Sequence, residues 1–289
     1  MGSKICYIMC FYLGERRKTC NNYKIDKLFY VKKQIEILQS TSHNLTKIIF
    51  NFNIEPKHYH HMSEIYSMVP KSIQGAEVEI NIRKNIGASY AAWSDLFNKY
   101  RSKYDYYIFN EDDYFFIEPN WDNYLVGKFK SYDDCGYLSL LVREPMGWNG
   151  YRKFAANSVG ISSTEILTQI YSKYGGLAYT SDENYNEWEG IMIDFGNRFI
   201  QEGYNLYDIR DDYSILSNDE SPTGHEPKCK MWKHHFWNDK LLCVTSKLYD
   251  TDKNHRYFVC FDREYQKDYQ PTSHKKAINC QNLKIDYPQ

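Results

Sequence analysis

The segment that most restricts the possible folds is a β-forming run, Tyr106–Asn110, that leads directly into three consecutive acids, Glu111-Asp112-Asp113. A buried strand cannot hold adjacent carboxylates, because burying an unpaired charge costs several kcal/mol. The acids must therefore lie where the strand leaves its sheet, and in open α/β sheets this edge binds ligands. A hard divalent cation carrying phosphate oxygens would neutralise them. A solvated acidic turn would contain the same residues, so the neighbouring segments must distinguish the two interpretations.

Strand-like and helix-like patterns alternate along most of the chain, which is typical of a parallel sheet with crossover helices. The predicted strands cover residues 5–12, 47–53, 77–81, 106–110, 135–142, 157–162 and 204–209. The predicted helices cover residues 28–38, 61–69, 91–100, 164–171 and 187–201, the fourth with Ser163 or Thr164 as its N-cap. We therefore expect an α/β protein with one Rossmann-like, mostly parallel central sheet.

The charges of the chain nearly cancel, with 36 Lys and Arg against 37 Asp and Glu. This balance does not indicate a nucleic-acid partner. No apolar run approaches the ~20 residues that cross a bilayer, and the apolar segment Lys4–Leu13 is too short for a signal peptide. The 8 cysteines are scattered without a Cys-x-x-Cys pair, which favours a reducing compartment. We expect a cytoplasmic protein without a transmembrane segment.

Four segments, in this order, resemble the GT-A family of nucleotide-sugar glycosyltransferases, in particular the inverting, family-2-like type with a single Rossmann-like sheet. They are the first strand Ile5–Tyr12, the turn Asn85-x-Gly87 before a helix, the acids 111–113, and the late acidic helix from Glu187 to Gly203. The resemblance covers roughly residues 4–210. It implies a GT-A catalytic domain over residues 1–215, with residues 216–289 as a C-terminal extension packed on it.

The resemblance also implies a donor site at the ends of the strands. The residues that would contact the nucleotide-sugar are Tyr12, Leu13, Glu15, Asn51, Asn53, Arg83, Asn85, Gly87 and Asp112. In the family an Asp-x-Asp (DXD) motif holds Mn²⁺ or Mg²⁺ against both phosphates, and Glu111-x-Asp113 occupies that position here. Asp113 is the first metal candidate and Glu111 the second, while Asp112 or Glu111 could instead contact the ribose or a water. The metal would act as a Lewis acid on the departing nucleoside diphosphate.

An inverting transfer needs a carboxylate base within hydrogen-bond reach of the acceptor hydroxyl. Glu189 is the first candidate, and Glu187 and Asp194 are its rivals. Helical spacing places Glu187 and Asp194 on one face and Glu189 on another. These acids would equally suit the helix dipole, and a retaining enzyme would need no such base, so the sequence leaves the stereochemistry open. Trp148, on a glycine-flanked loop, is the candidate for stacking on an acceptor sugar.

The sequence thus predicts a metal-dependent glycosyltransferase of glycan biosynthesis. Its donor would be a UDP- or GDP-linked sugar, and its acceptor a hydroxyl of a glycan or similar molecule. A nucleotidyltransferase is one alternative, although such an enzyme normally has a glycine-rich basic loop after the first strand, where this chain has only Gly14. A non-catalytic sugar-binding module of the same fold is the other alternative.

Overall fold

The computed structural model describes residues 2–14, 28–112, 114–116, 118–139, 142–143, 154–155, 159–178 and 188–208, together with 234–237, 240–245, 248–252 and 255–258. None of the helices in this described part is long and apolar enough to cross a membrane.

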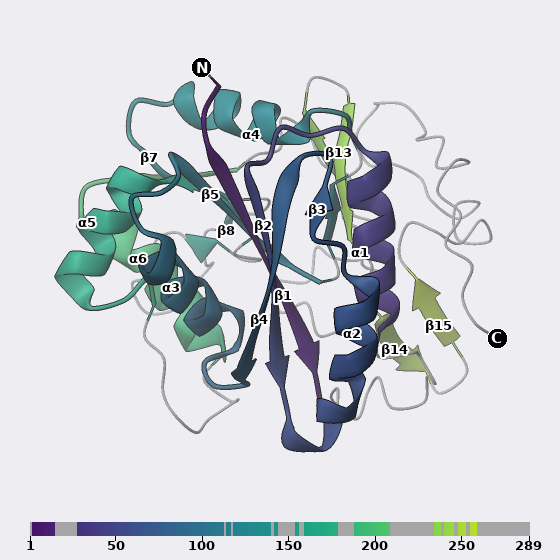
Figure 1. Ribbon diagram of the computed structural model, residues 1–289. Helices are drawn as coiled ribbons and strands as arrows, with labels where there is room; N and C mark the ends of the chain where they lie inside the picture. The colour runs from purple at the N-terminus through teal and green to yellow at the C-terminus, as the bar shows by residue number, and fades with distance from the viewer. Residues whose placement is uncertain are drawn as a thin grey trace.

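A central eight-stranded sheet organises the fold, with the strand order β11-β7-β10-β5-β1-β2-β4-β3 (Figure 1). Its strands are β1 (Ile5–Leu13), β2 (Lys47–Ile54), β3 (Ser72–Ile73), β4 (Ala76–Lys84), β5 (Tyr106–Glu111), β7 (Cys135–Ser139), β10 (Gly160–Ser163) and β11 (Asn205–Asp208). In this sheet only β3 and β10 run against the other strands. The predicted α/β class with a mostly parallel, Rossmann-like central sheet is confirmed.

Helices cover both faces of the sheet (Figure 1). They are α1 (Phe29–Ser40), α2 (Met62–Met68), α3 (Ala88–Tyr100), α4 (Trp121–Lys130), α5 (Thr164–Tyr174) and α6 (Trp188–Gln201), and a 3₁₀ helix, η2 (Pro56–His61), precedes α2. Alternate residues of β1 point to opposite faces. Tyr7 and Met9 pack in the core under α1, α2 and α4, whereas Cys6 and Ile8 pack under α3, α5 and α6. Burial on both faces explains why β1 is an uninterrupted apolar run.

The structure differs from the sequence prediction in one added helix and in how several strands pair. Helix α4 buries Trp121, Leu125 and Phe129, which follow one another at a helical spacing of four residues. Strand β10 inserts between β5 and β7 and runs antiparallel to both. The predicted strand 135–142 ends at Ser139, and β8 (Val142–Arg143) pairs instead with β9 (Phe154–Ala155). Short strands whose pairing is non-local leave little signal in the local sequence.

A second sheet connects the acidic segment to the last part of the chain. Strand β6 (Tyr114–Phe116) pairs with β13 (Lys240–Thr245), which pairs with β12 (His234–Trp237), and both pairs are antiparallel. Strands β14 (Leu248–Asp252) and β15 (His255–Phe258) form a separate hairpin. Phe116 lies opposite Cys243, so the residues directly after the acids are held by a strand from beyond residue 215. The proposed division at residue 215 stays a prediction.

Candidate functional site

The strand order reverses at β1, which places a topological switch point between β1 and β5. From β1 the chain proceeds through β2 to β4 on one side, and β5 lies on the other side. The crossover helices α1 and α3 belong to opposite faces. At the carboxyl ends of the two strands, Cys10 of β1 lies opposite Glu111 of β5. Open α/β sheets bind their ligands at this position, so the site is built around it.

On the face covered by α3, the side chains change from apolar to polar toward the carboxyl ends of the strands. Ile49 of β2 is buried in the core, and the next two residues on that face are Asn51 and Asn53. Asn81 and Arg83 of β4 lie beside them in register. A polar layer thus closes the apolar core at the end of the sheet where a ligand would bind.

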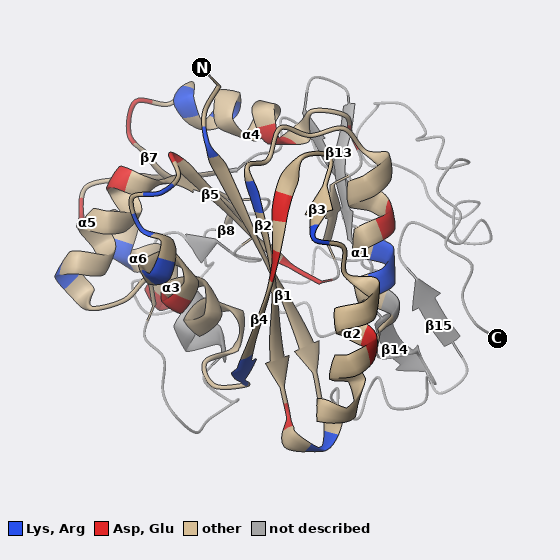
Figure 2. Ribbon diagram, in the orientation of Figure 1, with Lys and Arg blue, Asp and Glu red and all other residues tan. Residues whose placement is uncertain are grey.

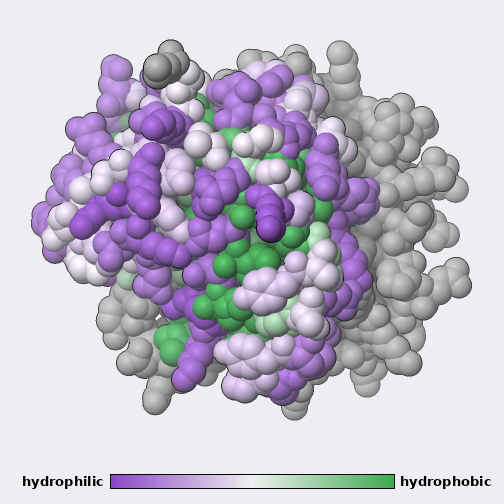
Figure 3. Space-filling model, viewed as in Figure 1, coloured by the Kyte–Doolittle hydropathy of each residue, from purple (hydrophilic) through white to green (hydrophobic). Residues whose placement is uncertain are grey.

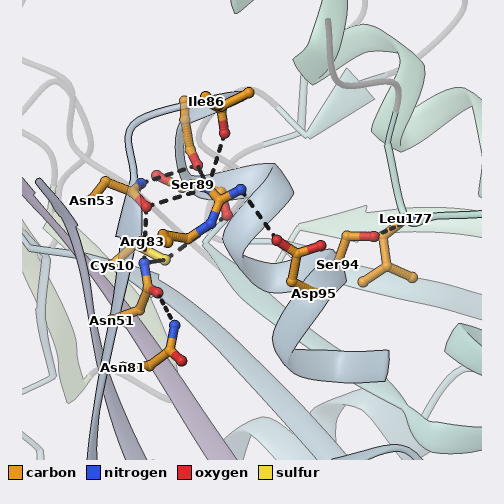
Figure 4. Close-up of polar contacts among 11 residues, drawn as sticks. Cys10, Asn51, Asn53, Asn81, Arg83, Ile86, Ser89, Ser94, Asp95 and Leu177 are labelled. Carbon is orange, nitrogen blue, oxygen red and sulfur yellow. Dashed lines mark hydrogen bonds and ion pairs between the residues drawn. The ribbon is translucent and has the colours of Figure 1, made fainter. Parts of the chain in front are cut away.

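The amides of this layer bond to one another (Figure 4). Asn81 Nδ2 donates to Asn51 Oδ1 at 2.7 Å, and Asn51 Nδ2 donates to Asn53 Oδ1 at 3.1 Å and to Cys10 Sγ at 3.7 Å. Asn53 Nδ2 donates to the carbonyl oxygen of Ala88 at 3.1 Å. Asn51 and Asn53 are buried, and buried amides of this kind are hydrogen-bonded as a rule. The layer therefore forms a fixed floor.

The guanidinium of Arg83 holds the turn between β4 and α3. Its Nη1 donates to the carbonyl of Ile86 at 2.9 Å and to Asn53 Oδ1 at 3.3 Å, and its Nη2 lies 3.1 Å from Asp95 Oδ2 (Figure 4). Gly87 has a φ of 67°, a conformation that glycine adopts without steric cost. The Asn85-x-Gly87 segment therefore forms the predicted turn, and Arg83 fixes that turn to the floor of the site.

The acidic segment begins at the end of β5, on the other side of the switch point. Glu111 Oε1 accepts a hydrogen bond of 3.2 Å from the hydroxyl of Ser89 in the first turn of α3. Gln34 of α1 donates from Nε2 to the carbonyls of Asp112, at 2.9 Å, and of Tyr114, at 2.7 Å. The side chains of Glu111 and Asp112 are half-buried. Contacts from both crossover helices thus hold the acidic turn in place.

Burial and the charge of Glu111 also raise the pKa of two neighbouring side chains, Cys10 and Tyr90. Burial raises the pKa of the Cys10 thiol well above its ordinary value, and the Glu111 carboxylate raises it further. The pKa of the buried Tyr90 hydroxyl is raised by the same two causes. Both groups therefore stay neutral at physiological pH. The Cys10 thiol accepts from Asn51 Nδ2 and donates to the carbonyl of Ser89 at 3.8 Å, so it serves here as a small polarisable hydrogen-bonding group rather than as a nucleophile.

Several predicted donor-site residues come together in this layer, and others do not. Tyr12 shares its face, and its hydroxyl donates to Glu55. Leu13 points to the opposite face, where it is buried in the core under α1 and α2. Asn85 lies half-buried in the turn. The predicted residues that lie outside the described residues are Glu15, Asp113, Trp148 and Glu187.

Of the three candidate bases, Asp194 is the one whose side chain the structure describes. Its Oδ2 lies 2.9 Å from Nε of Arg198, one helical turn later, and Arg198 Nη1 donates to the carbonyl of Gly176 at 2.7 Å. Glu189 belongs to α6, but its side chain lies outside the described residues. Across the described part of the chain, no group of three or more His, Cys, Asp or Glu side chains could hold a metal ion.

The sequence reasoning did not identify Gln34, Ser89 or Cys10 as parts of the site. Gln34 is 1% exposed, because it lies on the apolar face of α1 beside Val31 and Ile35. A lone amide on the buried face of an amphipathic helix was the available signal, because such a group needs a polar partner. Ser89 and Cys10 had no comparable signal, since their roles depend on which strands and helices become neighbours.

No protein-family model and no curated protein matches the chain. Among solved structures, it is similar to a CMP:2-keto-3-deoxy-manno-octonic acid synthetase complexed with CTP, with 14% identity over 71% of this chain and 89% of that chain and a TM-score of 0.43. It is also similar to residues 1–349 of S. aureus TarS in complex with UDP, with 9% identity over 72% of this chain and 58% of that chain and a TM-score of 0.40. A third similar structure is the apo-form glycosyltransferase GlyE of Streptococcus pneumoniae TIGR4, with 13% identity over 71% of this chain and 45% of that chain and a TM-score of 0.34. Similarity at this level assigns no activity to the chain.

Proposed function

We propose that the chain is a nucleotide-sugar-dependent glycosyltransferase that transfers a sugar to a hydroxyl of a glycan or similar acceptor. One observation carries the proposal. At the switch point, a rigid polar floor of Asn51, Asn53 and Arg83 meets a carboxylate, Glu111, beside the first turn of α3. This arrangement offers amides and a guanidinium to a nucleoside on one side and an acidic, metal-binding edge to its phosphates on the other.

The charges at this edge favour a diphosphate together with a cation. The N-terminus of α3 favours anions because its first backbone N–H groups and its dipole point toward them. The acids alone would repel phosphate, so a hard divalent cation is needed between the two. Glu111 and Asp112 offer carboxylate oxygens, which are the donors that Mg²⁺ and Mn²⁺ prefer. We assign the metal to Asp113 and Glu111, with the remaining ligands from phosphates and water. Its role would be to neutralise the departing diphosphate.

For the acceptor side we propose an inverting reaction with Glu189 as the base and Glu187 as its rival. Asp194 is less suited, because its carboxylate already pairs with Arg198 inside α6. We keep Trp148 as the proposed acceptor-stacking residue. The donor we propose is UDP- or GDP-linked, because these are the donors that the GT-A resemblance implies.

The first experiment measures thermal stabilisation by UDP, GDP and CDP with and without Mn²⁺. We expect one diphosphate to stabilise the protein only when Mn²⁺ is present, by about 2.7 kcal/mol at a hundredfold excess over Kd. Asp113→Ala and Glu111→Gln should abolish this response. Asp133→Ala, which removes an exposed carboxylate beyond α4, is the matched control and should leave the response intact. A protein that responds to none of these nucleotides would contradict the proposal.

The second experiment separates the reaction classes by their products. A glycosyltransferase releases a nucleoside diphosphate from a nucleotide-sugar, whereas a nucleotidyltransferase releases pyrophosphate from a nucleoside triphosphate and a sugar phosphate. We expect diphosphate release, which Glu189→Gln should abolish without weakening donor binding. Pyrophosphate release would instead identify a nucleotidyltransferase. Nucleotide binding without either product would identify a non-catalytic module.

A further inference from the structure

The outer edge of β4 is the longest strand edge on this side of the sheet without a partner among the described residues. Strand β3 covers only its beginning, where Ile73 pairs with Ala76 and Ser72 with Glu77. The last contact is the N–H of Val78, which donates to the carbonyl of Lys71 at 2.9 Å. From residue 79 to residue 84, no described strand pairs with this edge. In Figure 1, β4 lies in front of the other strands of the sheet, with its side toward the viewer.

The backbone groups that point outward along this edge follow from the alternation of a strand. The N–H of Glu77 points inward, because it donates to the carbonyl of Thr46 at 3.3 Å. The N–H of Val78 points outward to Lys71. Continuing the alternation, Ile80 and Ile82 direct their N–H and C=O groups away from β2. An edge of this kind is a template for another strand.

The charges along β4 are complementary to those of a second, antiparallel copy of the same strand. Glu77 and Glu79 lie in its first half, and Arg83 and Lys84 in its last half. An antiparallel copy therefore brings the acidic half of one strand beside the basic half of the other, whereas a parallel copy in register would bring like charges together. Opposite charges across a strand pair are stabilising, and like charges are destabilising.

The outward groups also determine the register. The N–H of Val78 is already bonded to Lys71, and the carbonyl of Lys84 accepts from the N–H of Ile86. Of the outward positions of β4, Ile80 and Ile82 therefore have no backbone partner among the described residues. If Ile80 lies opposite Ile82 of the second copy, each such pair exchanges both N–H···O bonds, and Asn81 lies on the twofold axis. The same register places Glu79 opposite Arg83 of the second copy, on the face that carries α3.

Apolar side chains line the other face of this edge. Val78, Ile80 and Ile82 are only partly buried against the core, as is Met68 of the adjacent α2. Hydrophobic residues reach the surface near the middle of this view of the molecule (Figure 3). Lys, Arg, Asp and Glu occur on both sides of that area (Figure 2). A second β4 would bury part of this apolar strip.

We propose that β4 pairs antiparallel with β4 of a second copy of this chain, so that the two central sheets join into one continuous sheet across a twofold axis at Asn81. The edge is only a few residues long. Because stable dimers usually bury at least about 1,200 Å², the association should be weak and should depend on protein concentration.

The test begins with sedimentation equilibrium of the full chain up to its solubility limit. We expect the mass to rise from 34.5 kDa toward twice that value as the concentration increases. Ile82→Lys should shift the protein to the monomer, because it places a charge in the apolar strip opposite Ile80 of the second copy. Tyr66→Lys adds the same charge to α2, at a side chain that is 57% exposed, and should leave the dimer intact. A wild-type protein that stays monomeric, or an Ile82→Lys protein that folds and still dimerises, would overturn the proposal.

A crosslinking experiment tests the register without relying on that variant. Opposite residues of a non-hydrogen-bonded antiparallel pair have Cα atoms about 4.5 Å apart, which is within the range that a disulfide spans. Asn81→Cys should therefore give a covalent dimer under mild oxidation. Ile80→Cys should not, because in this register residue 80 lies opposite residue 82. Equal crosslinking of the two variants would refute the register, and a wild-type dimer in which Asn81→Cys fails to crosslink would refute the interface.

Discussion

Replacing Arg83 by Gln tests whether one guanidinium fixes the turn over the candidate site. The shorter side chain loses the bonds to Ile86 and Asn53 and the ion pair with Asp95. Hydrogen bonds from a charged donor contribute about 1.5–3 kcal/mol, whereas an ion pair with a partner as exposed as Asp95, at 67%, contributes about 0–1 kcal/mol. The bonds from Arg83 to Asn53 at 3.3 Å and to the Ala88 carbonyl at 3.4 Å are long and add little, and the Ala88 carbonyl keeps its bond from Asn53. The short bond to Ile86 therefore sets the total, and we expect a loss of about 2 kcal/mol.

The measurement is urea denaturation of the wild type and Arg83→Gln, with Asp95→Asn as the matched control that removes only the ion pair. Asp95→Asn should cost less than about 1 kcal/mol. In the same samples, nucleotide binding should weaken about tenfold or more in Arg83→Gln, which corresponds to about 1.4 kcal/mol. If Arg83→Gln is as stable as the wild type, the turn is not held as described. If Asp95→Asn costs as much as Arg83→Gln, the surface ion pair dominates and the reasoning fails.

Three further predictions concern the frame of the site and are all checked by urea denaturation. A Cβ added at Gly160 would lie 2.1 Å from the carbonyl oxygen of Leu138, and β10 is paired on both sides. Gly160→Ala should therefore cost more than about 3 kcal/mol of stability. In the control Gly175→Ala, the added Cβ meets no neighbour but the residue has a φ of +74°, so the cost should be only about 1–2 kcal/mol. Ser163→Ala should cost about 1 kcal/mol, because it removes the N-cap bond of 3.3 Å from the N–H of Ile166, and an unchanged stability would contradict the cap assignment. Burial acts to raise the pKa of Glu79, but hydrogen bonds from Lys99, Tyr100 and Lys47 outweigh it and lower the pKa to about 2, below its ordinary value of 4.5. The stabilisation that the ionised Glu79 provides is therefore present above pH 4.5 and lost as the pH falls toward 2. In that pH window, the free energy of unfolding should decline less steeply in Glu79→Gln than in the wild type.

The local patterns predicted most elements of the sheet because each has a strong period of its own. The apolar run at residues 5–12 and the alternation at 77–81 correspond to β1 and β4, and the cap predicted at Ser163 or Thr164 corresponds to the start of α5, where Ser163 is the N-cap. The helix at 121–130 could also have been predicted from the sequence, since its apolar residues recur at helical spacing. The position of β10 in the sheet could not have been predicted, because a strand of four residues does not specify whether it runs parallel or antiparallel to its neighbours.

The sequence by itself determined that acids follow a buried strand and that asparagines end another, because burial and charge are properties of single segments. Only the tertiary structure placed these groups together. It decided that Asn51, Asn53 and Arg83 form one bonded floor and that Ser89 and Gln34 hold the acidic turn. It also directed Leu13 into the core, although Leu13 directly follows Tyr12 in the sequence. The physical reason is that successive side chains of a strand point to opposite faces, while the neighbours on each face come from residues far away in the chain.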